Sequence, residues 1–295
     1  MKILNLTIGL FSLLCGFKTI AQDNFLINQY IFNQQIFNPA TIGQDGDLGI
    51  FIYGDQNFNN TKGAPYSYLL TGHKSINDSA LHLGVNFQQN LYGKEKTIYL
   101  LGDIAYNFSL DSTRTLSIGL KSGLFNYNNP LTEYDLYPDE EYDYAFANDI
   151  NDNYLLVGLG VYYSSKNFIG GISSTNVSLI KLNDSDHKLK HNPSIYIFGG
   201  YDFKVKRKMI LQPHILLYSK KDLPVIYRGT ISLKYDKKLW LGASYDFHNS
   251  ANIFARWMFK NGIGIGYGYK FLIYNSNPDF IDSHSLSLSY DLVTQ

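Results

Sequence analysis

Runs in which apolar and polar residues alternate follow one another from Leu48 to the C-terminus. The last run, residues 283–292, shows the pattern most clearly, because leucines and Tyr290 alternate with serines and Asp291. A period of two places the apolar side chains on one face of a β-strand and the polar ones on the other. In a soluble sandwich the apolar face would meet a protein core, whereas in an outer-membrane barrel it would meet lipid.

About 14 such runs are predicted to form strands, and no segment with helical periodicity lies between them. Each run is long enough for a tilted crossing of a bilayer, and an even strand number is usual for bacterial outer-membrane barrels. The expected strands lie near residues 48–57, 65–76, 80–90, 96–110, 113–127, 153–164, 167–176, 193–204, 208–219, 224–236, 238–248, 250–260, 262–274 and 281–293.

The connections between these runs differ in length in a regular way. Every second connection is a short turn, such as Asp236-Lys237, whereas the intervening ones are mostly longer, above all 128–152 and 177–192. The connection at 248–250 is the exception, because it is short although it lies on the side of the long loops. Short periplasmic turns and longer extracellular loops are typical of outer-membrane barrels. The sequence therefore predicts an all-β transmembrane antiparallel barrel over residues 48–295.

The composition supports a membrane barrel. Aromatic residues make up 16% of the 295 residues and include 25 tyrosines, whereas charged residues make up 17% and the net charge is 0. The mean hydropathy of -0.16 excludes a bundle of membrane helices but not a barrel, because alternating strands average to neutral. Tyrosine suits the interfacial girdles of a barrel, and the neutral net charge gives no general attraction to nucleic acid.

The N-terminus has the features of a secretory signal peptide over residues 1–21. Lys2 supplies the positive start, residues 3–17 form a short apolar region, and Ala21 is the small residue that a signal peptidase requires. A lipoprotein signal at Cys15 is the alternative, but Leu14 stands where a lipobox needs a small residue. The mature chain would then be a multi-pass protein of a Gram-negative outer membrane, with no cysteine for disulfides or metal ligation.

Residues 22–47 lack strand alternation and are rich in Asn, Gln and aromatic residues. We expect them to form an ordered leader that lies on the periplasmic side or docks inside the lumen. The alternative is a floppy periplasmic tail.

No catalytic, metal or cofactor site is expected. The seven histidines are scattered over separate runs, and no HExxH or GxSxG motif occurs. Asp246 and His248 share a face near the outer end of one run, which offers a weak hydrolase alternative. The charges expected in the lumen have both signs, which fits salt-bridged packing or a plug better than a selective pore. They are Lys121, Asp202, Arg228, Lys234, Asp246, Arg256 and Lys270.

The connection at 128–152 is acidic and aromatic, which suits a protein-docking surface. A solvated loop is an equally weighted alternative, and the spacing lacks the EF-hand pattern of a calcium site. The candidate partner-binding residues are Glu133, Tyr134, Asp135, Tyr137, Glu140, Tyr142 and Tyr144.

A specific motif occurs in the leader: Gln29, Tyr30, Asn33, Asn38, Pro39, Ala40 and Gly43. With this motif, the chain resembles the PorP/SprF proteins of the Bacteroidetes type IX secretion system. Residues 63–65, 158–163, 239–245 and 283–290 are also similar, so the resemblance covers essentially the whole mature chain. The chain departs from the family pattern at residues 55–58, where an Arg-Gln-Trp run is common, and at Leu292, where an aromatic residue is usual.

The resemblance implies a non-enzymatic outer-membrane barrel that helps to export a partner protein or adhesin and anchors it at the cell surface. Its partners would be a secreted cargo, recognised by a C-terminal domain, and periplasmic components of the secretion machine. A general diffusion or nutrient porin is the alternative, and it requires an open lumen. Expected inward-facing rings such as Tyr162, Trp240 and Phe254 favour a filled lumen instead.

Overall fold

A computed structural model describes residues 27–44, 46–57, 63–76, 80–134, 144–183, 192–221, 223–247, 250–273 and 282–292. All statements below concern these residues. The expected signal peptide at 1–21 lies outside them.

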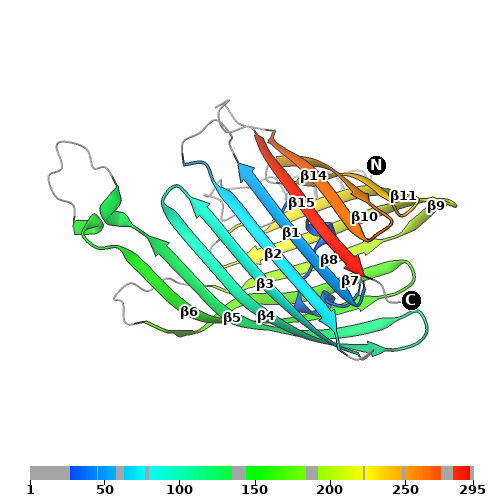
Figure 1. Cartoon of the computed structure of the whole chain (residues 1–295), viewed down its shortest axis with the longest axis horizontal. Helices are drawn as coiled ribbons and strands as arrows, with labels where there is room; N and C mark the ends of the chain where they lie inside the picture. Colours follow the sequence, from blue (N-terminus) through cyan, green and yellow to red (C-terminus); the bar gives the residue numbers. More distant parts are fainter. Residues whose placement is uncertain are drawn as a thin grey trace, which may run out of the picture.

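The chain forms a single antiparallel sheet that closes on itself (Figure 1). The last strand pairs with the first over Leu48–Asn57, and β10 and β11 close the sheet on the far side. Two strands, β8 and β9, both pair with β10 and are one crossing interrupted at Asp202, so the barrel has 14 strands, as predicted. The strands are β1 (Leu48–Asn57), β2 (Tyr66–Ser75), β3 (Leu81–Tyr92), β4 (Glu95–Ser109), β5 (Thr115–Asn129), β6 (Ile150–Ser164), β7 (Phe168–Lys181), β8 (Ser194–Tyr201), β9 (Phe203–Lys206), β10 (Met209–Lys220), β11 (Ile226–Tyr235), β12 (Leu239–Asp246), β13 (Ser250–Met258), β14 (Ile263–Leu272) and β15 (Asp282–Leu292).

The apolar face of the strands points outward. In β15, Leu286 is 63% exposed and Leu288 is 46% exposed, whereas Ser285 and Ser287 are buried in the interior. The same alternation recurs around the barrel, where exposed Ile, Leu and Val side chains form an outer belt. The apolar face of the strands therefore meets lipid and not a protein core. Within the described residues, no helix has the length and apolar character needed to cross a membrane.

The strand boundaries differ from the sequence-based ones mainly at the long loops. The strands β5, β6 and β7 extend further than predicted, so the two long connections shrink to 130–149 and 182–193. The predicted loop at 128–152 was therefore too wide, and Asp152 is a buried residue of β6. The connection between β3 and β4 is also short, because Gly93 has φ +64 and permits a tight turn on the long-loop side.

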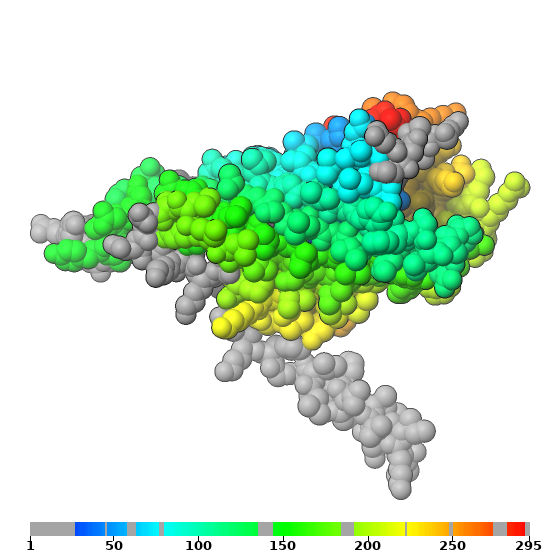
Figure 2. Space-filling model, turned by 90° about the horizontal axis from the view of Figure 1, so that it is seen from below, coloured from blue at the N-terminus to red at the C-terminus, as the bar shows by residue number. Residues whose placement is uncertain are grey.

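The barrel wall is not of even height. Three strands, β4, β5 and β6, have 15 residues each and β7 has 14, whereas β12 has 8 and β13 has 9. The long strands project on the extracellular side as a raised wall, seen at the left of Figure 1 and of Figure 2. The lumen face of this raised wall carries a buried cluster of Leu101, Phe125, Tyr154 and Leu156.

Rings cover glycines on the lumen face at several places. In each case the ring belongs to the residue paired directly opposite the glycine on the neighbouring strand. The ring occupies the space that a Cβ atom on the glycine would need. A glycine thus leaves room for a neighbouring ring, which is the use expected for glycine in a sheet interior. The pairs are Gly49 with His73, Gly171 with Phe198, Gly200 with His214 and Gly242 with Phe254.

Candidate functional site

Residues 27–44 lie inside the barrel and are called the plug below. The plug contains two 3-10 turns, η1 (Tyr30–Phe32) and η2 (Pro39–Thr41). Gln29, Asn38 and Ala40 are fully buried, and Tyr30 is only 2% exposed. A polar leader suits this position, because the lumen face of the wall is itself lined by Ser, Thr and Asn.

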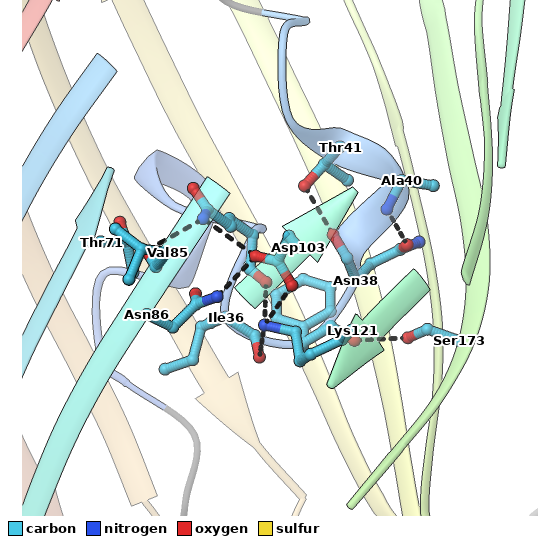
Figure 3. Close-up of polar contacts among 12 residues, drawn as sticks. Ile36, Asn38, Ala40, Thr41, Thr71, Val85, Asn86, Asp103, Lys121 and Ser173 are labelled. Carbon is cyan, nitrogen blue, oxygen red and sulfur yellow. Dashed lines mark hydrogen bonds and ion pairs between the residues drawn. The ribbon is translucent and has the colours of Figure 1, made fainter. Parts of the chain in front are cut away.

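The Asn38-Pro39-Ala40 part of the motif docks against β5 and β6 (Figure 3). The Asn38 side chain accepts a hydrogen bond from the Ala40 N–H at 2.9 Å and donates one to the Val161 carbonyl at 3.1 Å. Pro39 stands at the first position of η2, where its missing N–H costs nothing. Gly119 and Gly160 make the approach possible, since a Cβ on either would overlap atoms of this motif.

The other motif residues bind the opposite side of the wall. Gln29 donates to the Ser285 hydroxyl at 3.1 Å and accepts from Ser287 at 2.6 Å. The Tyr30 hydroxyl donates to Thr230 at 3.0 Å. Asn33 donates to the Thr71 hydroxyl at 2.5 Å, and Gly43, with φ +79, begins the exit from the lumen towards β1. The plug is therefore held from several strands at once.

A buried ion pair fastens the middle of the plug. Lys121 lies 3.2 Å from the Asp103 carboxylate, and both side chains are almost completely buried. Asp103 also accepts hydrogen bonds from Gln35 at 2.9 Å and from Asn86 at 2.5 Å. Lys121 in turn donates to the Gln35 carbonyl at 3.0 Å. The pair is thus satisfied by partners from both wall and plug, as a buried pair requires.

A second buried pair closes the plug near the extracellular mouth. Arg228 makes two hydrogen bonds to the Asp246 carboxylate, one of 2.8 Å, and donates a third to the Ile27 carbonyl at 3.0 Å. Ser250 also donates to Asp246 at 3.0 Å. Asp246 is the carboxylate of the weak hydrolase alternative, and in the structure it is paired with Arg228. The other residue of that alternative, His248, lies outside the described residues. In the described part of the chain, no group of three His, Cys, Asp or Glu residues could hold a metal.

Below the plug, the periplasmic end of the barrel contains a cavity of about 490 Å³. Its lining combines the plug segment 31–35 with the periplasmic ends of several strands, including Asp202, Lys234, Trp240 and Arg256. Residues 31–35 of the plug therefore form the wall of this cavity that faces the extracellular side.

The candidate partner-binding residues are only partly described. Glu133, Tyr134 and Tyr144 lie on the 130–149 connection at the tip of the raised wall, and Tyr144 is 84% exposed. Lys94 donates to the Glu133 carbonyl, and its ammonium group lies 5.2 Å from the centre of the Tyr134 ring. The remaining candidates, Asp135, Tyr137, Glu140 and Tyr142, lie outside the described residues.

The base of the same connection is closed by a short polar contact. The Asp149 carboxylate accepts hydrogen bonds from the Thr132 backbone N–H at 3.0 Å and from its hydroxyl at 2.8 Å. These bonds favour the ionised form and lower the pKa of Asp149. The visible part of the loop is therefore an organised tip.

Several residues that hold the plug were not singled out from the sequence. They include Asp103, Gly119 and Gly160, of which only Gly160 lay in a stretch noted in the sequence, the run at 158–163. A usable signal does exist, because small residues on the lumen face of adjacent strands leave space that another segment has to fill.

These features define a class: an outer-membrane β-barrel whose lumen is occupied by its own N-terminal segment. Residues 19–290 match the family described as type IX secretion system membrane protein PorP/SprF, and the chain belongs to that family. No curated protein matches the chain.

Solved structures support the barrel fold. The chain is similar to the CymD monoaromatic hydrocarbon channel, with a TM-score of 0.55, 10% identity and coverage of 93% of this chain and 95% of that one. The toluene transporter TodX of P. putida matches with a TM-score of 0.51 and 11% identity, over 89% of this chain and 95% of that one. Omp33 of Acinetobacter baumannii matches with a TM-score of 0.50 and 10% identity, over 84% of this chain and 100% of that one. At such low identity the likeness concerns the fold alone, and the protein is an outer-membrane barrel of the type IX secretion system.

Proposed function

We propose that this barrel helps to export a secreted partner protein and holds it at the cell surface by binding the partner's C-terminal domain. The observation that supports a docking role best is the occupied lumen. Polar groups of the plug are bonded to the wall along its whole length, from Ile27 to Gln44. A barrel filled in this way serves as a rigid support rather than as a conduit.

The docking surface in this proposal is the tip of the raised wall. Tyr134 and Tyr144 present aromatic rings there, and the 130–149 connection holds seven acidic residues and no Lys or Arg. Aromatic residues enriched at a surface are typical of protein interfaces. The partner's docking face would then be basic or aromatic.

Replacing residues 131–148 by a short Gly-Asn linker tests this role, because the anchoring β5 and β6 strands remain. We expect the deleted form to insert and stay heat-modifiable on gels, while the secreted partner is released into the medium. Retention of the partner at the parental level would exclude the tip as the docking surface. A matched deletion on the same side, within 221–225, serves as the control and is expected to leave retention unchanged.

The porin alternative makes a separate prediction. Purified protein in a planar bilayer is expected to show no large steady conductance, because the plug fills the lumen. A large steady current would favour the diffusion channel over the docking role.

A further inference from the structure

The periplasmic rim carries a segregated positive charge. Two adjacent turns, 203–208 and 236–238, contain six basic residues and one acidic residue, although the whole chain is balanced at 25 of each. The basic residues are Lys204, Lys206, Arg207, Lys208, Lys237 and Lys238, and they are called the basic rim below. The one acidic residue, Asp236, lies 3.4 Å from Lys208 and 3.6 Å from Lys238. Because this one carboxylate is shared by two lysines, the basic rim keeps a net positive charge.

An open sheet edge lies beside this charge. On one side, β9 pairs with β10 through Phe203, Lys204 and Lys206. On the other side, the pairing of β7 ends at Tyr201, and the last backbone hydrogen bond runs from the Asp202 N–H to the Asn167 carbonyl. Within the described residues, no strand covers the second edge of β9. The β9–β10 hairpin therefore projects beyond its neighbour, as seen at the right of Figure 1.

The orientation of the β9–β10 hairpin distinguishes between two possible partners of the basic rim, membrane lipid and a periplasmic protein. Its outward face carries Tyr201, Phe203 and Val205, which are 39%, 50% and 55% exposed and suit the membrane boundary. Lys204 shares the opposite face with Asp202, which lines the periplasmic cavity together with Lys234. By the same alternation, Lys204 and Lys206 lie on the side of the barrel mouth, where a protein segment can reach them, rather than on the side of the surrounding lipid.

From this geometry we infer that the basic rim and the β9 edge bind an extended acidic segment of a periplasmic protein. The segment adds as a strand to β9, so that its backbone pairs with the open edge and its carboxylates meet the basic rim. An exposed edge is a ready template for strand addition, and side-chain charges then select the partner. The surface is at the opposite end from the cargo tip, so the inference rests on the proposed function only in requiring that the barrel works with other proteins.

Peptide binding to the full-length protein in phosphatidylcholine nanodiscs tests the inference. The probe is a labelled short peptide in which Glu alternates with Val and Thr, and its affinity is followed by fluorescence anisotropy. We expect saturable binding that weakens as salt is added. The double charge reversal Lys206→Glu/Arg207→Glu is expected to weaken binding about tenfold, because two attractive exposed charges become repulsive.

Two controls make the outcome specific. The matched reversal Lys220→Glu/Lys221→Glu changes the net charge equally at the extracellular end and is expected to leave the affinity unchanged. Both variants are first shown to be folded by their heat-modifiable gel mobility. A second peptide of the same charge has Pro at each Val and N-methylated amides at the neighbouring Glu residues. It lacks ladder donors at these positions on both of its edges and is expected to bind about tenfold more weakly.

The possible contradictions are distinct. Equal binding of the proline peptide would overturn strand addition. No binding of the acidic peptide, together with charge-dependent binding of the folded protein to phosphatidylglycerol vesicles, would make the rim a lipid contact. Neither result would affect cargo retention at the extracellular tip, so failure of this inference and failure of the proposed function are distinguishable.

Discussion

The plug and the 130–149 connection are both rich in polar and aromatic residues, yet the structure uses them in opposite ways. In the plug, Gln29 and Asn38 are fully buried, and their amides are bonded to the plug and the wall. In the connection, Tyr144 is 84% exposed, and Glu133 and Thr132 are also exposed although their backbone groups are hydrogen-bonded. The same residue types therefore serve internal packing in one place and face solvent in the other.

The difference has an energetic basis. A buried amide that loses its partner costs about 1–3 kcal/mol, so each plug residue is tied to the stability of the barrel. An exposed tyrosine carries no such penalty. Its substitution usually changes the free energy of unfolding of the free protein by less than about 0.5 kcal/mol. Changes in the plug should therefore alter the barrel itself, whereas changes in the loop should alter only what binds to it.

The strongest test of this comparison places a side chain where the plug docks. In Gly119→Leu, the new side chain would overlap the backbone of Ala40. We expect the plug to leave its seat, which would give steady currents in planar bilayers and cleavage of the leader by an added protease. Gly229→Leu is the matched control, because nothing lies within 4 Å of a Cβ at this position. A silent Gly119→Leu barrel with a protected leader would show that the plug tolerates the intrusion.

The next largest effect is expected from the buried ion pair. Asp103→Asn leaves the Lys121 charge buried without its carboxylate, which should lower the free energy of unfolding by about 3–5 kcal/mol. Urea unfolding in lipid vesicles measures this change. The double variant Asp103→Asn/Lys121→Met is expected to recover most of the loss, because it removes the stranded charge and keeps an oxygen that accepts from Gln35 and Asn86. A double variant as unstable as Asp103→Asn would contradict this explanation.

The smallest effect is expected at the base of the loop. The pKa of Asp149 is lowered in the folded protein, so its contribution is present at neutral pH and is lost as the pH falls through that lowered value. Hydrogen exchange at the Thr132 amide, expressed relative to the intrinsic rate at each pH, should show the loss of protection. In Asp149→Ala, protection is expected to be low at every pH, while the stability of the barrel stays unchanged. A pH-dependent protection that survives in this variant would rule out Asp149 as its source.

The sequence predicted the barrel well, because alternation is a local property of each strand. The expected run at 48–57 and the observed β1 coincide, and the other boundaries differ by a few residues. The main boundary errors fell at the extracellular ends of β5, β6 and β7. In β7 a bulge at Asn176, which has φ +60, shifts the alternation. In β5 and β6, Asn-rich stretches continue the strands beyond the apolar belt. There the outward face is polar, as in Asn126 and Asn153, so the alternation that marks a lipid-facing strand disappears.

The interior could be predicted less well. The motif residues of the leader were noticed, but their partners come from strands far away in the chain, and no local pattern connects Gln29 with Ser285 or Asn38 with Gly160. The inward direction of Arg228 and Asp246 followed from alternation, whereas their pairing with each other and with Ile27 did not. The partner-binding role of the loop stays a prediction.

The contacts of Gln29 also set an order of events during biogenesis. Its two serine partners lie 256 and 258 residues further along the chain, on the last strand. The seat of the plug is incomplete until β15 has paired with β1, so the part of the barrel that is synthesised first can settle only after the wall has closed. Such long-range contacts form late, because their loop-closure entropy is recovered only when the rest of the fold is in place. During that interval the polar groups of the leader that bond to β15 in the finished barrel have to find water instead.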